Sequence, residues 1–161
     1  MFAACVSPSP VSSAGTTVRS ALGNDLSVTA NMRADEVDPD ILYVTAHITN
    51  ERSVEAELVI DGCPLTIRVY SDQGRADSLA WASNAPSRTP NVRERGCFDV
   101  KDRIRLDPGN SQTLETWLRM SDVSSAQARS REYRVTVSIR ILEPRLVTGE
   151  IAAGVFRFPN G

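Results

Sequence analysis

The 161-residue chain has little of what most enzyme sites are built from. His47 is its only histidine, Lys101 is its only lysine, and it has three cysteines. A catalytic triad would have to use His47 as its base, and the chain has no G-x-S-x-G motif. It has no CxxC pair or histidine cluster of the kind that binds zinc. We therefore predict no catalytic residues, no metal site and no cofactor, and we expect a protein that is not an enzyme.

The chain also lacks an excess of either charge and lacks long hydrophobic segments. It has 18 Lys and Arg against 20 Asp and Glu, and its net charge is −2. Proteins whose main partner is nucleic acid carry a clear positive excess, so that class is not expected. No run of about 20 apolar residues is present, which excludes a hydrophobic membrane-spanning helix. We expect contact with a membrane only through a possible lipid anchor.

The first residues resemble the end of a bacterial lipoprotein signal. Phe2-Ala3-Ala4-Cys5 places two small residues before a cysteine, and the stretch up to Thr17 is rich in Ser, Pro, Ala and Gly. Such a composition cannot bury a core and forms a flexible tether. This predicts a tail over residues 1–23, lipidation of Cys5 and an extracytoplasmic location. No apolar h-region precedes Cys5, so a second interpretation stays open, namely a cytoplasmic N-terminus with a free cysteine.

From residue 24 onward the hydrophobic pattern has a period of two, which indicates strands. The expected strands are 26–32, 41–49, 55–60, 65–70, 78–82, 103–106, 111–120, 133–141 and 150–158. Asp61-Gly62 is expected to be a turn, and residues 124–128 favour one helical turn. Parallel α/β folds are excluded because crossover helices are missing. Residues 24–161 therefore predict one all-β domain, an antiparallel immunoglobulin-like β-sandwich of about nine strands.

The segment RLDPGNSQTLETW joins two of these strands by a turn. Pro108 suits the second position of a type II turn, and Gly109 suits the third, which requires a positive φ. Trp117 follows in the next strand with the opposite parity to Leu114 and Leu118. A large ring there would fill the space between two sheets if it pointed inward. Parity alone leaves open which of the two faces is inside.

These motifs resemble the BsuPI-type intracellular proteinase inhibitor family. The Leu-x-Pro-Gly turn at Leu106–Gly109, the following Trp117 and the strand that begins at Tyr133 are similar to that family, as are residues 47–58, 63–74 and 79–83. The resemblance covers about residues 44–141 and implies an immunoglobulin-like sandwich that binds protein, with a proteinase as the named partner. Two features depart from the family: residues 84–96 form an insertion, and no glycine precedes Tyr133. No inhibitory residue is carried over.

Two cysteines remain once Cys5 is set aside. Cys63 and Cys97 each lie at a strand edge next to a turn. In an exported protein this placement predicts a Cys63–Cys97 disulfide that ties the intervening loop to the sheet. The alternative is a pair of buried free thiols.

The polar loop 83–96 is the predicted binding site for a protein partner. It has no hydrophobic period and contains two prolines, and loops at the end of a sandwich commonly carry function. The predicted contact residues are Trp81, Arg88, Arg93 and Arg95.

The sequence thus predicts a non-enzymatic protein-binding β-sandwich, a proteinase-inhibitor-like domain of a bacterial lipoprotein. Two alternatives stay open: an accessory module of a cell-envelope assembly, and a carbohydrate-binding module that uses Trp81, Tyr70 and Tyr43. We interpret His47 as a surface residue and the Asp38/Asp40 and Asp99/Asp102 pairs as turn residues.

Overall fold

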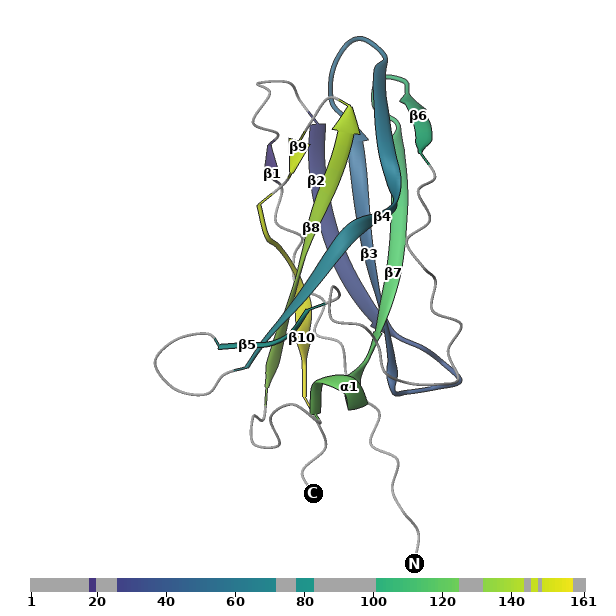
Figure 1. The fold of residues 1–161 in the computed structure, drawn as a ribbon. Coiled ribbons are helices and arrows are strands. Elements are labelled where there is room, and N and C mark those ends of the chain that lie inside the picture. Colours follow the sequence, from purple (N-terminus) through teal and green to yellow (C-terminus); the bar gives the residue numbers. More distant parts are fainter. Residues whose placement is uncertain are drawn as a thin grey trace, which may run out of the picture.

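The computed structural model describes residues 18–19, 26–71, 78–82, 101–124, 132–143, 146–147 and 149–157. These residues form two sheets and one short helix (Figure 1). The elements are β1 (Val18–Arg19), β2 (Leu26–Ala34), β3 (Ile41–Asn50), β4 (Ala56–Ser71), β5 (Ser78–Ala82), β6 (Asp102–Leu106), β7 (Ser111–Arg119), α1 (Met120–Ser124), β8 (Tyr133–Glu143), β9 (Leu146–Val147) and β10 (Ile151–Phe156). No helix in these segments is long and apolar enough to cross a membrane.

All strand pairs within the two sheets are antiparallel. One sheet has the order β1-β2-β3-β7, and the other has the order β10-β8-β4-β5, with β6 also paired to β4 and β9 to β8. One sheet thus contains β1, β2, β3 and β7, and the other contains β4, β5, β6, β8, β9 and β10, as in immunoglobulin-like sandwiches. The predicted all-β, antiparallel immunoglobulin-like β-sandwich is confirmed. The two-residue strand β1 lies within residues 1–23, which were predicted to form a flexible tail, and it pairs with β2.

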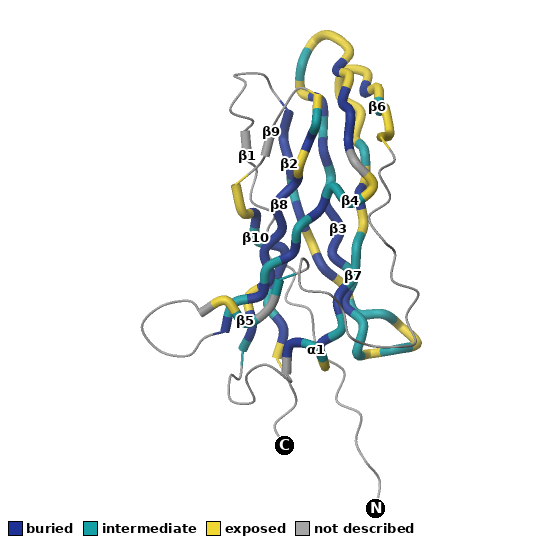
Figure 2. Tube along the Cα trace, viewed as in Figure 1, coloured by how far each residue is buried: buried dark blue, intermediate teal, exposed yellow. Residues whose placement is uncertain are grey.

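The hydrophobic core lies between the inner faces of the two sheets (Figure 2). The alternation of hydrophobic and polar residues in the sequence predicts which residues it contains. On β3 the buried residues are Leu42, Val44, Ala46 and Ile48, and on β8 they are Tyr133, Val135, Val137, Ile139 and Ile141. Each of these side chains removes apolar area from water, at about 25 cal/mol per Å². The outward positions between them carry polar groups, because a strand alternates its side chains between two faces.

The long strand β4 corrects one prediction. Residues 55–60 and 65–70 were expected to be separate strands joined by a turn at Asp61-Gly62, but β4 runs from Ala56 to Ser71. Its register with β8 shifts between Ile60 and Leu65, so the extra residues form an irregularity within the strand. Pro64 has no N–H to donate to the ladder, which suits that place. β4 can then pair with β6 through its first half and with β5 through its second.

The Pro-Gly turn closes against a buried asparagine. Gly109 has φ +77°, and the Asn110 amide donates to the Asp107 carbonyl over 3.0 Å, so the predicted type II turn is confirmed. The Gly109 amide donates to the Asn50 carbonyl (2.7 Å), and the Asn50 amide donates to the Asn110 carbonyl (2.9 Å). These contacts hold the β6–β7 turn against the end of β3.

The Asn50 side chain completes what we call the Asn50 corner, formed by Asn50, Val54, Leu106, Gly109 and Asn110. Its Nδ2 donates to the carbonyls of Val54 (2.9 Å) and Leu106 (2.8 Å), and its Oδ1 accepts from the Arg52 amide. Asn50 is 0% exposed. A buried amide with this many partners stabilises the fold, since each would otherwise be an unpaired polar group.

At the opposite end, the connection from β2 to β3 is tied to α1. Asp40 accepts from the Ser121 amide (2.8 Å) and hydroxyl (2.6 Å), and its carbonyl accepts from the Met120 amide (2.8 Å). A helical turn was expected at residues 124–128, of which 125–128 lie outside the described residues, and the described helix α1 covers Met120–Ser124. Its start at Met120 depends on Asp40, which is distant in sequence, so the local pattern could not indicate it.

The two sheets approach each other closely at Gly154. A Cβ at this position would lie 2.9 Å from two side-chain carbons of Met32, on the other sheet. The absent side chain therefore lets β10 pack closely on β2, and the register of β10 with β8 shifts between Ala152 and Gly154.

Candidate functional site

The outer face of the β2-β3-β7 sheet carries side chains in regular rows. Because the three strands are in register, Arg33, Tyr43 and Trp117 lie directly opposite one another in one row. Asn31, Thr45 and Glu115 form the next row. We call these six residues the Tyr43 face. The rows beyond it contain the polar sets Thr29, His47, Thr113 and Ser27, Thr49, Ser111.

Arg33 is held in place on the Tyr43 face. Its guanidinium carbon lies 4.3 Å from the centre of the Tyr43 ring, a cation–π distance. Its Nη2 lies 3.5 Å from Oε2 of Glu115, which also accepts from the Thr45 hydroxyl (3.3 Å). The side chains of Arg33 and Glu115 are 55% and 43% exposed. These contacts add little stability in water, but they fix the orientation of the exposed groups.

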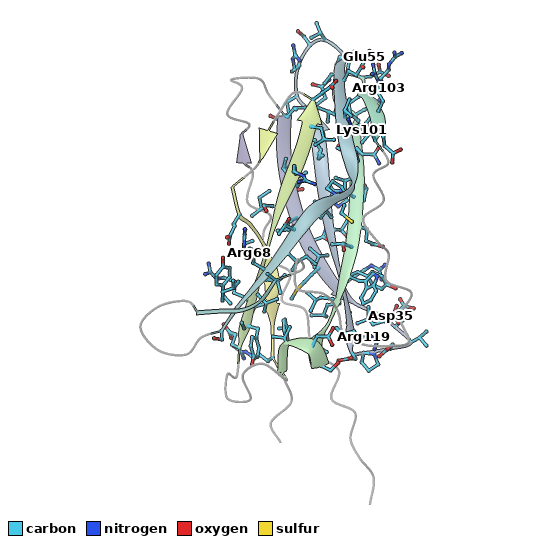
Figure 3. The ribbon with its side chains drawn as sticks, in the orientation of Figure 1. Asp35, Glu55, Arg68, Lys101, Arg103 and Arg119 are labelled. Carbon is cyan, nitrogen blue, oxygen red and sulfur yellow. The ribbon has the colours of Figure 1, made fainter. Side chains whose placement is uncertain are left out.

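The loop of residues 35–40, the Asp35 loop, lies at the end of this face. Oδ1 of Asp35 accepts from the amides of Val37 (2.9 Å) and Asp38 (2.7 Å). These two hydrogen bonds lower the pKa of Asp35, and the bond from the Asp38 amide has the larger effect. The Tyr43 hydroxyl adds a hydrogen bond to the same carboxylate, which lowers the pKa further. Arg119 pairs with both Asp38 and Asp40 at 3.3 Å. Figure 3 shows Asp35 and Arg119 close together on this flank. The loop is thus shaped by its own polar contacts, and the expected turn role of Asp38 and Asp40 is seen.

The parity question at Trp117 has a clear answer. Leu114 and Leu118 are buried, and Trp117 lies on the outer face in the row with Tyr43. The ring therefore does not fill the space between the sheets, and β3 and β7 pair without a bulge. A half-buried Trp beside Tyr and Arg on a sheet is the feature that sequence reasoning left undecided. The register with β3, which sequence cannot give, identifies it.

The predicted binding loop is not part of the described structure. Arg88, Arg93 and Arg95 lie outside the described residues, as do Cys5 and Asp99. Trp81 belongs to β5, where it pairs with Val69, and its side chain is also outside what is described. The loop and the lipidation of Cys5 therefore stay predictions.

Cys63 lies within β4 and is disulfide-bonded. Cys97 lies outside the described residues, so the Cys63–Cys97 pairing stays a prediction as well.

The described residues offer no assembled catalytic or metal centre. In these segments no group of three or more His, Cys, Asp or Glu side chains is placed to hold a metal ion. His47 lies on the outer face of β3, as expected, and its Nδ1 shares a hydrogen bond with the Thr113 hydroxyl (3.0 Å). Within the same segments no carboxylate hydrogen-bonds this ring, as a triad would require.

Comparison with known proteins gives only distant structural likeness. No protein-family model matches the chain, and no curated protein matches it. Among solved structures, a protein assigned as ApaA from Bordetella pertussis has a TM-score of 0.39 and 14% identity, covering 84% of this chain and 94% of that one. A β-glucosidase from Kluyveromyces marxianus has a TM-score of 0.42 and 12% identity, covering 84% of this chain. A Bacteroides uniformis β-glucuronidase 2 has a TM-score of 0.35 and 14% identity, covering 89%.

This chain spans only 14% and 13% of the lengths of those two glycosidases. With every TM-score below 0.5, the likenesses carry no argument about activity or ligand.

Proposed function

We propose that this chain is a non-enzymatic protein-binding β-sandwich and that the Tyr43 face is its binding surface. The observation that carries the proposal is the row Arg33, Tyr43, Trp117 on adjacent strands. Arg, Tyr and Trp are the residues most often found at the energetic centres of protein interfaces. Here they stand on a sheet, which holds them more firmly than a loop would.

The composition of the face favours a protein partner. Arg33 and Glu115 supply one charge of each sign, and Asn31 and Thr45 supply short polar groups beside the aromatic rings. An interface centre of rigid aromatics surrounded by polar groups matches the usual anatomy of a protein–protein contact. Arg33 stacks over the Tyr43 ring, so part of that ring is already covered, which suits a flat sugar-stacking role less well.

The resemblance to the BsuPI-type family makes a proteinase the first class of partner to examine. The proposal also includes an extracytoplasmic lipoprotein anchored through Cys5, with a cytoplasmic protein as the alternative. Mass spectrometry of the protein from a membrane fraction tests the anchor, and an unmodified Cys5 would end that part of the proposal.

Site-specific photo-crosslinking tests the face itself. A photoreactive amino acid at Asn31, which is exposed in the second row, is compared with one at Glu143, exposed on β8 of the other sheet. We expect an adduct from position 31 and none from position 143. The adduct identifies the partner, which is then purified and titrated against wild type and variants.

Trp117→Ala should weaken binding of that purified partner by about 10- to 100-fold, as expected for an interface anchor. Thr49→Ala, two rows from the Tyr43 face on β3, is the matched control and should leave Kd unchanged. Equal adducts from both positions, or a Kd insensitive to Trp117→Ala, would show that this face does not bind the partner. Deletion of residues 87–95 in parallel separates the face from the predicted loop.

A further inference from the structure

A second polar cluster lies on the outer face of the other sheet. Both carboxylate oxygens of Glu150 accept from the Tyr70 hydroxyl, at 2.7 and 2.8 Å. The Thr136 hydroxyl donates to Oε2 (2.8 Å), and Nη1 of Arg68 donates to Oε1 (3.1 Å). We call these four residues the Glu150 clasp. In Figure 3, Arg68 lies on the flank opposite Asp35 and Arg119, so the clasp is separate from the Tyr43 face.

The clasp fastens one end of a strand at the edge of the sheet. Arg68 and Tyr70 come from β4 and Thr136 from β8, the two central strands, whereas Glu150 directly precedes β10. Among the strands that the structure describes, β10 pairs with β8 and with no other. The clasp therefore joins the start of an edge strand to the middle of the sheet through side chains.

The register shift divides β10 into two parts that are held differently. Upstream of it, only Ile151 and Ala152 pair, with Val137 and Thr136. Downstream, Gly154, Val155 and Phe156 pair in register, the Phe156 ring stacks on Tyr133 at 5.1 Å, and Arg157 forms an ion pair with Glu132. The short upstream part thus depends on the buried Ile151 side chain and on the clasp.

The clasp contains two titratable groups whose charges oppose each other's ionisation. Burial acts to raise the pKa of Glu150, but the hydrogen bonds from Tyr70 and Thr136 and the charge of Arg68 outweigh it and lower that pKa. The hydrogen bond to Glu150, followed by burial, raises the pKa of Tyr70. The charged groups facing the pair are Arg68 from β4 and Arg134 from β8, whose guanidinium lies 5.2 Å from the Tyr70 ring centre.

The signs of these shifts define a window of stability. A carboxyl group with a lowered folded pKa stabilises the fold above its unfolded pKa, and this contribution is lost as pH falls through the folded value. A tyrosine with a raised folded pKa stabilises below its unfolded pKa, and this is lost as pH rises through the folded value. The clasp is therefore complete at neutral pH and weakened at both extremes.

We propose that the Glu150 clasp is a pH-dependent catch, meaning a set of side-chain contacts that holds the upstream part of β10 on β8 at neutral pH and releases it at low and at high pH. Protonation of Glu150 in acid, or ionisation of Tyr70 in alkali, frees residues 149–152 and exposes the edge of β8 at Thr136 and Val137. The downstream part of β10 and the remaining sandwich stay folded, because their contacts do not involve the clasp. The exposed β8 edge has backbone N–H and C=O groups that can pair with an extended segment of another chain.

Hydrogen exchange with mass spectrometry on the full chain tests the catch. After correction for intrinsic rates, amides of residues 150–152 in wild type should exchange about 3- to 10-fold faster once the pH has fallen through the folded pKa of Glu150 than at pH 7, as expected for a lost charged hydrogen bond in a partly exposed setting. Residues 154–156 should change much less. Glu150→Gln should show the fast rate at pH 7 already and little further change in acid.

Tyr70→Phe distinguishes the acid opening of the clasp from its alkaline opening. It should move the acid opening to higher pH, because Glu150 loses its main donor, and it should abolish the alkaline opening. Glu57→Gln is the matched control, since Glu57 lies on β4 of the same sheet, pairs with Arg103 and Arg105 of β6, and is 39% exposed against 36% for Glu150. It should leave the profile of residues 150–152 unchanged.

Near-ultraviolet circular dichroism at each pH confirms that the sandwich stays folded. The catch is disproved if Glu150→Gln and wild type share one pH profile, or if both parts of β10 open together. These outcomes do not bear on partner binding at the Tyr43 face.

Discussion

The Asn50 corner and the Asp35 loop lie at opposite ends of the sandwich and use the same chemistry. In each, a short side-chain oxygen accepts a backbone amide two residues onward, Arg52 in one and Val37 in the other. They differ in exposure, since Asn50 is 0% exposed whereas Glu36, Val37 and Pro39 lie in water. Burial makes the first an element of stability. Exposure makes the second a means of fixing shape beside the Tyr43 face.

Among the variants that test this comparison, Asn50→Ala should have the largest effect on stability. It removes the two Nδ2 donors and leaves the partly buried carbonyl of Val54 and the buried carbonyl of Leu106 without that partner. We expect the free energy of unfolding to fall by about 2–4 kcal/mol, since an unsatisfied buried polar group costs roughly 1–3 kcal/mol. Urea titration measures it. Asn50→Asp keeps the acceptor but not the donors, and should be no more stable. A loss well under 1 kcal/mol in Asn50→Ala would mean that the corner is not a source of stability.

Gly109→Ala should have a smaller effect of about 1 kcal/mol, because an L residue at φ +77° is strained although a Cβ there meets nothing within 4 Å. Gly149→Ala is the matched control, since it also has open space but no positive φ. Thermal unfolding of both variants compares the two. Equal shifts in Tm would show that the backbone angle at Gly109 is not what the turn requires.

The smallest effect is expected at the Asp35 loop. The amides of Asp38 and Val37 lower the pKa of Asp35, so its contribution is present above the unfolded pKa and is lost as pH falls through the folded value. Carbon-detected NMR titration should give Asp35 a pKa below the ordinary value for aspartate. Asp35→Asn should change neutral-pH stability little and remove this part of the acid dependence. An ordinary pKa at Asp35 would show that the loop is open in solution.

The sequence predicts the inner faces of the strands because burial on one side imposes a period of two, as on β3 and β8. It predicts the turn at Pro108-Gly109 because that geometry is local. It does not predict the continuity of β4, since Asp61-Gly62 has turn composition and only pairing with β6, β5 and β8 decides the matter.

The candidate site is less predictable for the same reason. Trp117 and Tyr43 are far apart in sequence, and only the register of β3 with β7 places them in one row. The partners of Glu150 on β4 are about 80 positions away, so no local pattern could indicate the clasp. The full burial of Asn50 likewise depends on contacts with Leu106, Gly109 and Asn110, which are distant from it in the sequence.

The central pairing of β4 with β8 has a consequence for how the chain reaches its native state. Ile67 lies opposite Val137, some 70 residues further along the chain, and the larger sheet has no middle until such segments meet. Loops of that length must close before the contacts between the two strands can stabilise the sheet. Folding is therefore slow, on the order of milliseconds to seconds for sandwiches of this kind. During that interval the unpaired strands β4 and β8 expose hydrophobic side chains and unpaired backbone groups, which makes them prone to aggregation.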